Sequence, residues 1–259
     1  MRETAEIVIS VRNLKVGYGE TVILHNINFQ VECGEVFVIL GGSGSGKSTL
    51  LKTLIGLYPP REGEVWIDGI NLVTATGDER RNLLKKFGVA YQSGALFGSM
   101  NILENVRLPM DELTTLPEPL KELTALAKLK LVGLSAAVQK MPAELSGGMQ
   151  KRAAIARAMA LDPRILFLDE PSAGLDPVTS ADLDLLITEL ANHFGITFVI
   201  VTHELASINK IADRVIMLDS RARTIVAEGP PAELRESSDP RVHRFFNREP
   251  DAVASGLHL

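Results

Sequence analysis

The sequence predicts an α/β fold around a mixed, largely parallel sheet, and three observations support this class. Runs of consecutive apolar residues occupy positions 36–40, 165–168 and 198–201, which is typical of strands buried on both faces of a parallel sheet. Helical apolar spacing follows the first two runs, so that strands and helices alternate along the chain. Polar and acidic residues come directly after the runs, at the sheet edge where such folds bind ligands.

A glycine-rich loop joins the first of these strands to the helix that follows it. The loop reads GGSGSGKST and fits the phosphate-loop pattern G-x-x-x-x-G-K-[ST]. Its glycines let successive backbone N–H groups turn toward one anion, Lys47 supplies a positive charge, and the Ser48 hydroxyl can ligate Mg²⁺. We therefore expect nucleotide phosphates to bind at the start of this helix. The predicted binding residues are Gly41, Gly42, Ser43, Gly44, Ser45, Gly46, Lys47, Ser48 and Thr49.

The composition is that of an ordinary globular protein and excludes several classes of function. The 259 residues are 46% hydrophobic, and the formal net charge of −5 gives no reason to expect broad nucleic-acid binding. Cys33 is the only cysteine, which excludes an intrachain disulfide and a cysteine-rich metal site. The apolar runs fall far below the ~20 residues of a membrane helix, and the first residues do not resemble a signal peptide. We expect a cytosolic chain that reaches a membrane only through a partner.

Four short strand patterns predict a small antiparallel sheet beside the phosphate loop. They are separated by turn signals, among them Gly17 and Gly34. Tyr18 falls in the first predicted turn, where its ring can either stack on a purine or remain a partly exposed turn aromatic. The four patterns cover residues 7–11, 22–24, 27–31 and 65–67.

Helical periodicity dominates the middle of the chain and predicts a helical subdomain inserted into the α/β core. The leucine-rich run 126–134 favours a helix that faces the core rather than a membrane anchor. The predicted breakers are Pro109, Pro117, Pro119 and Pro142. The expected division is a core of residues 1–92 and 162–230, a helical subdomain of residues 93–161, and a polar tail of residues 231–259.

An acidic pair stands at the end of the second buried strand. Asp169 is placed to hold Mg²⁺ through its water shell, and Glu170 to orient or deprotonate an attacking water. Such a pair alone is more often a solvated loop, but the phosphate loop lies upstream in the same α/β pattern. Further along the chain, Ser146, Gly147 and Gly148 open a helix that we expect to run to about residue 161, and they present a hydroxyl and bare N–H groups at its positive end.

Residues 145–150 read LSGGMQ, and with the phosphate loop they make the chain resemble the ATP-binding cassette (ABC) ATPases over about residues 7–235. The resemblance implies that Ser146 to Gly148 cover the γ-phosphate of ATP bound to a second copy, in a head-to-tail dimer with two composite sites. It also implies Mg²⁺ as cofactor, bound by Ser48, Gln92 and Asp169.

The resemblance assigns further roles to single residues. Tyr18 matches the aromatic that stacks on adenine, and Gln92 matches the glutamine that reaches Mg²⁺ and the attacking water. Asp176 lies in the stretch SAGLD, which matches the loop that crosses the dimer interface. His203 matches the switch histidine that contacts the γ-phosphate and acts with Glu170, although a lone histidine after a strand is more often structural.

Three classes of ABC ATPase compete, and the sequence favours a transporter subunit. Chromosome and repair ATPases need long coiled coils or zinc-binding cysteines, and translation factors usually carry two cassettes, whereas one set of motifs occurs here. Residues 92–106 and 239–246 resemble the ATPases of MCE-associated phospholipid transporters. This resemblance implies a peripheral protein on the cytoplasmic face of the inner membrane, with permease chains and an MCE-domain protein as partners. An ATPase for another solute, such as an amino acid, is the alternative.

The tail carries a second open question at Phe245 and Phe246. These residues are either a hydrophobic anchor on their own domain or a contact between subunits. Residues 251–259 match no pattern.

Overall fold

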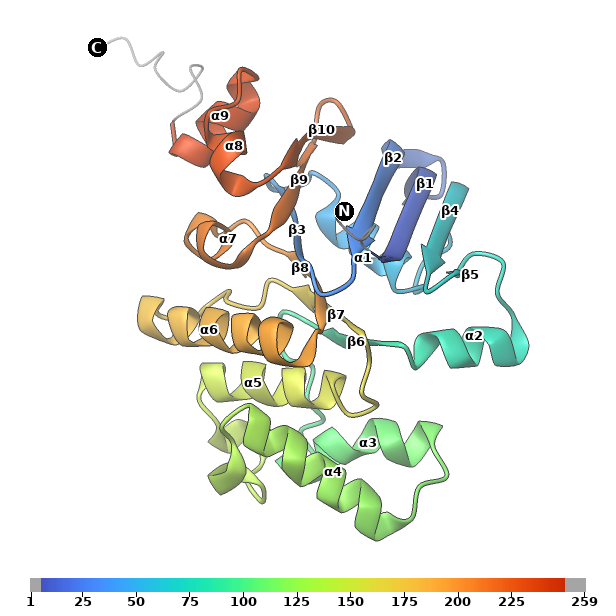
Figure 1. Ribbon diagram of the computed structural model, residues 1–259, viewed down its shortest axis with the longest axis vertical. Coiled ribbons are helices and arrows are strands. Elements are labelled where there is room, and N and C mark those ends of the chain that lie inside the picture. The colour runs from blue at the N-terminus through green and yellow to red at the C-terminus, as the bar shows by residue number, and fades with distance from the viewer. Residues whose placement is uncertain (1–5, 250–259) are drawn as a thin grey trace, which may run out of the picture.

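The computed structural model describes residues 6–249, and a six-stranded mixed sheet is the centre of their fold (Figure 1). The strands run in the order β10-β9-β3-β8-β7-β6, with β10 antiparallel to β9 and the other neighbours parallel. The predicted α/β fold is therefore confirmed. The bounds are β3 (Val36–Gly41), β6 (Phe87–Ala90), β7 (Ile165–Asp169), β8 (Thr197–Val201), β9 (Arg214–Asp219) and β10 (Thr224–Gly229).

A four-stranded antiparallel sheet of order β2-β1-β4-β5 lies beside this core, as predicted. Its first two strands are longer than expected, because β1 continues through Gly17 to Tyr18 and the turn falls at residues 19–20. Irregular pairing near Asn13 and Asn26, both at positive φ, breaks the alternation of apolar residues. The sequence therefore predicts only residues 7–11 of β1, and it divides β2 into two strands, 22–24 and 27–31, which are one strand in the structure. The bounds are β1 (Ile7–Tyr18), β2 (Thr21–Glu32), β4 (Glu62–Ile67) and β5 (Ile70–Asn71).

Helices cover both faces of the mixed sheet. The bounds are α1 (Lys47–Leu54), α2 (Gly77–Leu84), α3 (Ile102–Leu113), α4 (Glu118–Leu131), α5 (Gly147–Ala158), α6 (Pro177–Phe194), α7 (Leu205–Ile211), α8 (Pro231–Arg235) and α9 (Pro240–Asn247), with short 3₁₀ turns at Ser135–Ala137 and Pro142–Glu144. Among these residues, no helix combines the length and the apolar character needed to cross a membrane.

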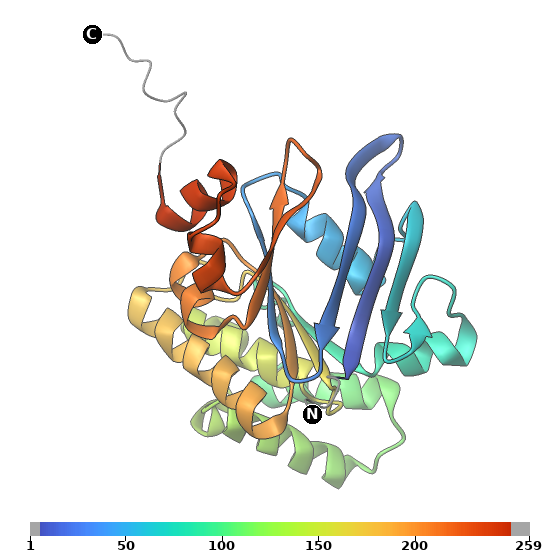
Figure 2. The ribbon, with the colours of Figure 1, turned by 45° about the horizontal axis from the view of Figure 1, so that its top comes forward.

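The mixed sheet separates two hydrophobic cores, and β3 shows the division. Val38 and Leu40 pack into the core that contains α3 to α6, whereas Phe37 and Ile39 pack into the core that contains α1 and the antiparallel sheet. This alternation follows from the period of two along a strand. Figures 1 and 2 show α1 beside the antiparallel strands, with α5 and α6 on the other side of the sheet. Helices α1 and α5 are thus held apart by the sheet itself.

The inserted segment between β6 and β7 is helical, as predicted, but one predicted breaker is wrong. Pro109 lies inside α3, whereas Pro117, Pro119 and Pro142 stand at helix starts. A capping box of Asn101 and Glu104 fixes the start of α3, and its buried face then carries the helix past the proline.

The spacing of the leucines in α4 predicts that they face the core, but the helix buries a different face. Leu120, Leu123, Leu126 and Leu131 are exposed, and Lys121, Ala125 and Leu129 are buried. Lys121 can be buried because it forms ion pairs with Asp111 and Glu118, each at 3.1 Å. The run 126–134 still contributes to the core, through Leu129, Val132 and Leu134.

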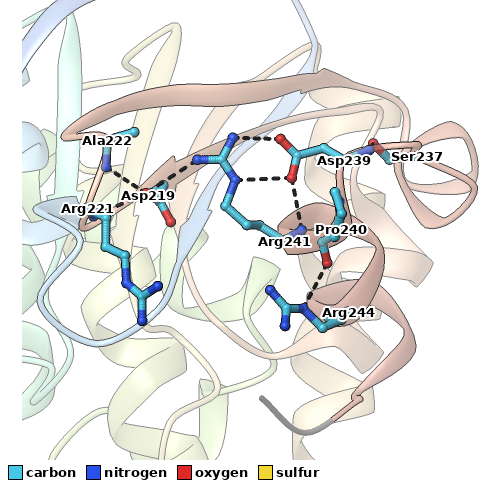
Figure 3. Close-up of polar contacts among 8 residues, drawn as sticks. All are labelled: Asp219, Arg221, Ala222, Ser237, Asp239, Pro240, Arg241 and Arg244. Atoms are coloured by element: carbon cyan, nitrogen blue, oxygen red, sulfur yellow. Dashed lines mark hydrogen bonds and ion pairs between the residues drawn. The ribbon is translucent and has the colours of Figure 1, made fainter. Parts of the chain in front are cut away.

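The described part of the tail is two helices rather than a polar extension. Val242 and Phe246 of α9 are 0% and 4% exposed and join the core, while Phe245 is only partly buried. Arg241 donates to Asp239 and lies 3.6 Å from Asp219 at the end of β9, which ties α9 to the β9–β10 hairpin (Figure 3). Phe246 is therefore a hydrophobic anchor on its own domain. Residues 251–259 lie outside the described part of the chain.

The adjacent phenylalanines of α9 give a stability test. We expect Phe246→Ala to lower the free energy of unfolding by about 3 kcal/mol, because it opens a cavity in a filled core. Phe245→Ala should cost clearly less, since that ring is partly solvated. Urea denaturation and amide hydrogen exchange of α9 measure both changes. Equal losses in the two variants would contradict the anchor assignment.

Candidate functional site

The phosphate loop connects β3 to α1, and its backbone requires glycine at two positions. Gly41 has φ +158°, and a Cβ there would lie 2.6 Å from the carbonyl oxygen of Leu218. Gly46 has φ +95°, and a Cβ would lie 2.9 Å from side-chain carbons of Ile23 and Leu24. Any other residue would strain the backbone and push against the neighbouring strands. The loop is thus packed tightly between β9 and the antiparallel sheet.

Lys47 folds back over the loop that carries it. Its Nζ donates to the carbonyl oxygens of Gly41 at 2.8 Å and Gly42 at 3.2 Å. Burial lowers the pKa of Lys47, and the nearby acids Glu170 and Asp169 oppose that shift. The ammonium group is therefore held at the loop, within the field of the acidic pair.

Two hydroxyl groups of the loop are in different surroundings. Ser48, at the start of α1, is an exposed residue. The Oγ of Ser45 is buried and lacks a hydrogen-bond partner within the described residues. A buried hydroxyl without a partner is uncommon, and it fits a loop whose polar groups are arranged for a ligand.

Tyr18 ends β1 next to the phosphate-loop helix. Its hydroxyl donates to Thr49 Oγ1 at 3.3 Å, and its ring meets the Tyr58 ring edge-on with centroids 5.3 Å apart. The residue is 43% exposed. An aromatic surface thus remains accessible beside the loop.

The acidic pair lies where adjacent parallel strands end. Asp169 is the last residue of β7 and pairs with Val201 of β8. Burial raises the pKa of Asp169, and Glu170 raises it further, while Lys52, Lys151 and Lys47 oppose the shift. The nearby lysines do not fully offset the cost of holding this half-buried negative charge beside a second acid. A bound cation would stabilise the charged form.

Glu170 and His203 face each other across the ends of β7 and β8. His203 Nδ1 lies 2.8 Å from Glu170 Oε1. The carboxylate side chain is only 14% exposed, whereas the imidazole is 67% exposed. The geometry gives the carboxylate a fixed direction and leaves the ring of His203 open to a ligand.

Gln92 follows β6 at the same sheet edge. It lines an open pocket of about 540 Å³ together with Tyr91, Ser93, Asp169, Ala173 and Gly174. The side chains expected to surround the terminal phosphates thus come from loops after β3, β6, β7 and β8. The sheet brings together Lys47, Ser48, Gln92, Asp169, Glu170 and His203 at the ends of these strands.

The donor chemistry of these residues fits Mg²⁺. The hydroxyl of Ser48, the amide of Gln92 and the carboxylate of Asp169 supply hard oxygen atoms. Within residues 6–249 no group of three or more histidine, cysteine, aspartate or glutamate side chains could form a metal cage. Few protein ligands are what Mg²⁺ needs, because it completes its shell with water and substrate phosphates.

The structure does not bring Ser146, Gly147 and Gly148 to the phosphate loop of the same chain. Ser146 is the N-cap of α5, and its Oγ accepts from the backbone N–H of Met149 at 3.3 Å. Helix α5 belongs to the core on the opposite face of the sheet from α1. The predicted helix start is confirmed, although α5 ends at Ala158, before the expected residue 161.

Asp176 has a local structural role in this chain. It caps α6 by accepting from the N–H groups of Val178 at 3.0 Å and Thr179 at 3.1 Å. Hydrogen bonds from Thr179 lower the pKa of Asp176, so it stays a carboxylate at neutral pH.

Lys151 is the residue of this region that the motifs did not single out. Its Nζ donates to the backbone oxygens of Gln92 and Glu170, the latter at 3.2 Å. Lysine within a helix carries no sequence signal for such contacts, because both acceptors are backbone atoms distant in the chain.

Comparisons with known proteins agree with this arrangement. The family model described as "ABC transporter" matches residues 24–173. The chain is 39% identical to the intermembrane phospholipid transport system ATP-binding protein MlaF of Escherichia coli K12, covering 99% of this chain and 93% of that protein. It is 40% identical to the MlaF of Haemophilus influenzae, over 94% and 92% of the two chains. The probable ribonucleotide transport ATP-binding protein mkl of Mycobacterium leprae is 40% identical, over 93% and 69%.

Solved structures show the same fold. A dimeric post-hydrolysis state of the ATP-binding cassette MJ0796, bound to ADP and Pi, superposes with a TM-score of 0.77 at 33% identity. The match covers 86% of this chain and 98% of that one. The cbiO1 protein of Clostridium perfringens, part of the cbiONQ transporter complex, gives a TM-score of 0.81 at 29% identity, over 94% and 95% of the two chains.

Two neighbouring glycines at the start of α5 should differ in their tolerance of alanine. A Cβ on Gly148 would lie 2.4 Å from Thr179 Cγ2, whereas one on Gly147 would meet Leu175 at an ordinary 3.5 Å. We expect Gly148→Ala to destabilise the protein by about 1–3 kcal/mol and Gly147→Ala to be neutral or stabilising by up to about 1 kcal/mol.

Chemical denaturation measures both changes, and the second substitution Thr179→Ser supplies the control. Serine lacks the clashing methyl group but keeps the hydroxyl that donates to Asp176. It should restore most of the stability lost in Gly148→Ala. A loss that persists in the double variant would refute this steric explanation.

Proposed function

The chain belongs to the ABC transporter family as an ATP-hydrolysing subunit, and we propose that it powers phospholipid transport between the inner and outer membranes. One observation carries the choice of cargo: the identity of 39% to the E. coli phospholipid transport protein extends over 99% of this chain. The resemblance of residues 92–106 and 239–246 to the MCE-associated group supports the same cargo.

The proposed chemistry is attack of water on the γ-phosphate of ATP. Lys47 and the N–H groups of the loop would hold the terminal phosphates, and Tyr18 would stack on adenine. Ser48, Gln92 and Asp169 would hold Mg²⁺, which supplies charge neutralisation at the phosphates. Glu170 would orient and deprotonate the water, while His203, held against it at 2.8 Å, would contact the γ-phosphate.

A second copy of the chain would complete each site. The signature residues Ser146, Gly147 and Gly148 lie across the sheet from their own phosphate loop, so a head-to-tail partner would have to supply them. Asp176 would lie at this interface, close to the start of α5. Two ATP molecules would then bridge two copies, and loss of the γ-phosphate would weaken the bridge.

The proposed setting is the cytoplasmic face of the inner membrane. Integral permease subunits and an MCE-domain protein would be the partners. Within the chain, residues 1–92 with 162–230 would form the ATPase core and residues 93–161 the helical subdomain, and residues 231–259 would be the C-terminal tail, whose helices α8 and α9 pack on the core.

A ribonucleotide cargo is the second candidate, because the mycobacterial relative of 40% identity carries that name. An importer for another solute, such as an amino acid, is a third. Purification of the tagged protein from native membranes, with identification of the proteins that accompany it, separates these proposals. An MCE-domain protein together with bound phospholipid supports the first. A periplasmic solute-binding protein would overturn it.

The assignment of Glu170 predicts a variant that binds ATP without turning it over. In Glu170→Gln the amide cannot accept the proton, so we expect kcat to fall by about a hundredfold or more while ATP binding persists. A phosphate-release assay and equilibrium binding of a fluorescent nucleotide measure the two properties. Lys47→Ala is the contrasting variant and should lose productive binding. Near-normal phosphate release from Glu170→Gln would contradict the assignment.

Tyr18 gives a test of the adenine position. Tyr18→Ala should weaken ATP binding by about five- to a hundredfold, because stacking of a base on an aromatic ring contributes about 1–3 kcal/mol. Tyr18→Phe keeps the ring and loses only the hydrogen bond to Thr49, so it should bind nearly as wild type. Titration with ATP and with inorganic triphosphate measures the effect. An equal loss for triphosphate, which has no base, would show that the ring does not stack on adenine.

A further inference from the structure

We propose that Lys151 is a positioning residue for ATP hydrolysis, which holds the loop after β6 and the loop after β7 in one fixed arrangement. The inference rests on the proposed roles of Gln92 and Glu170. Its basis is that one buried ammonium group donates to the backbone of both residues.

The surroundings of Lys151 are unusual for a lysine. The residue is 9% exposed, and within the described residues its ammonium group forms no ion pair with a carboxylate. A buried charge of this kind needs compensation, and here the ammonium group donates to two backbone oxygens. Hydrogen bonds that involve a charged group are about twice as strong as neutral ones. The contact is therefore suited to linking the loop after β6 to the loop after β7.

The backbone of Glu170 needs such support. Its φ of +45° lies in the left-handed region, which a non-glycine residue adopts only with backbone strain. The N–H of Glu170 donates to Val201 at 2.8 Å, and its carbonyl oxygen accepts from both Ala173 at 3.2 Å and Lys151 at 3.2 Å. Both sides of the residue are thus held. This conformation directs the carboxylate toward His203.

The helix that carries Lys151 begins at the signature residues. Gly147 and Lys151 are four residues apart on α5, about 6 Å along the helix axis. A movement of the helix start on engagement with the second copy would be passed to Lys151 within one turn. Lys151 would thus connect two sites. One is the partner's site, which the start of α5 would complete, and the other contains Gln92 and Glu170 of its own chain.

Arg157, six residues further along α5, provides a matched comparison. Its guanidinium donates to the carbonyl oxygens of Gly94 at 3.0 Å and Ala95 at 2.7 Å. It therefore binds the same loop after Gln92 through Gly94 and Ala95 rather than bridging to Glu170. A substitution of Arg157 therefore loosens that loop but leaves the contact of Lys151 with Glu170 in place.

The test uses the full chain, purified with the membrane partners that it retains, and ATP as the probe. In Lys151→Met we expect kcat to fall by at least about tenfold, or about 1.4 kcal/mol in activation free energy. The dissociation constant for ATP, measured with a fluorescent analogue, should change by less than about threefold, because the phosphate loop is untouched. Lys151→Arg, which can still donate to two carbonyls, should recover most of kcat. Arg157→Met should keep kcat within about threefold of wild type.

Four results would overturn the inference: an unchanged kcat in Lys151→Met, an equal loss in Arg157→Met, a parallel loss of ATP affinity, or no recovery in Lys151→Arg. Should Lys151→Met fail to fold, Lys151→Gln decides the matter, because its amide keeps a donor for one carbonyl. An intermediate kcat then supports the inference, and a wild-type kcat contradicts it. Glu170→Gln in the same assay separates the two proposals: if it hydrolyses ATP normally, the proposed role of Glu170 fails, and otherwise only the role of Lys151 is at issue.

Discussion

The position of the mixed sheet between α1 and α5 is the constraint on which the site depends. A parallel sheet gathers the loops after β3, β6, β7 and β8 at one edge, which brings Lys47 and Glu170 near each other without any long-range pairing of loops. The same sheet keeps the start of α5 on its other face. In the proposed function, one chain would therefore present two incomplete halves. The topology, rather than any surface feature, is the reason why a second copy would be needed.

Burial of charge gives this edge its chemical character. Desolvation pushes Lys47 and Asp169 toward their neutral forms, while the opposite charges around them oppose that change. Such a balance leaves a site that gains stability when phosphates and a cation enter together. The ion pair of Arg241 in α9 with Asp219 of the β9–β10 hairpin, in contrast, is partly solvated and contributes mainly to holding the tail in place.

Most of the fold, with the phosphate loop between a strand and a helix, could be predicted from the sequence, because local chemistry determines these features. The strand before Gly41 and the N-cap at Ser146 each have a pattern within a few residues. The errors arose where tertiary packing decides. Pro109 continues a helix whose buried face is strong enough, and the exposed leucines of α4 show that apolar spacing alone does not tell which face is covered. Lys151 could not be found, since its partners are backbone atoms supplied by the fold.

The central claim, that each site combines the phosphate loop of one copy with the signature of another, is tested most directly by mixing two inactive variants. Lys47→Ala disables the phosphate loop, and Ser146→Arg disables the signature. If the sites are composite, an equal mixture should recover about a quarter of the wild-type ATPase rate, because half of the dimers are mixed and each mixed dimer holds one intact site. If each site is instead complete within one chain, the mixture will stay as inactive as either variant alone, and the account is contradicted.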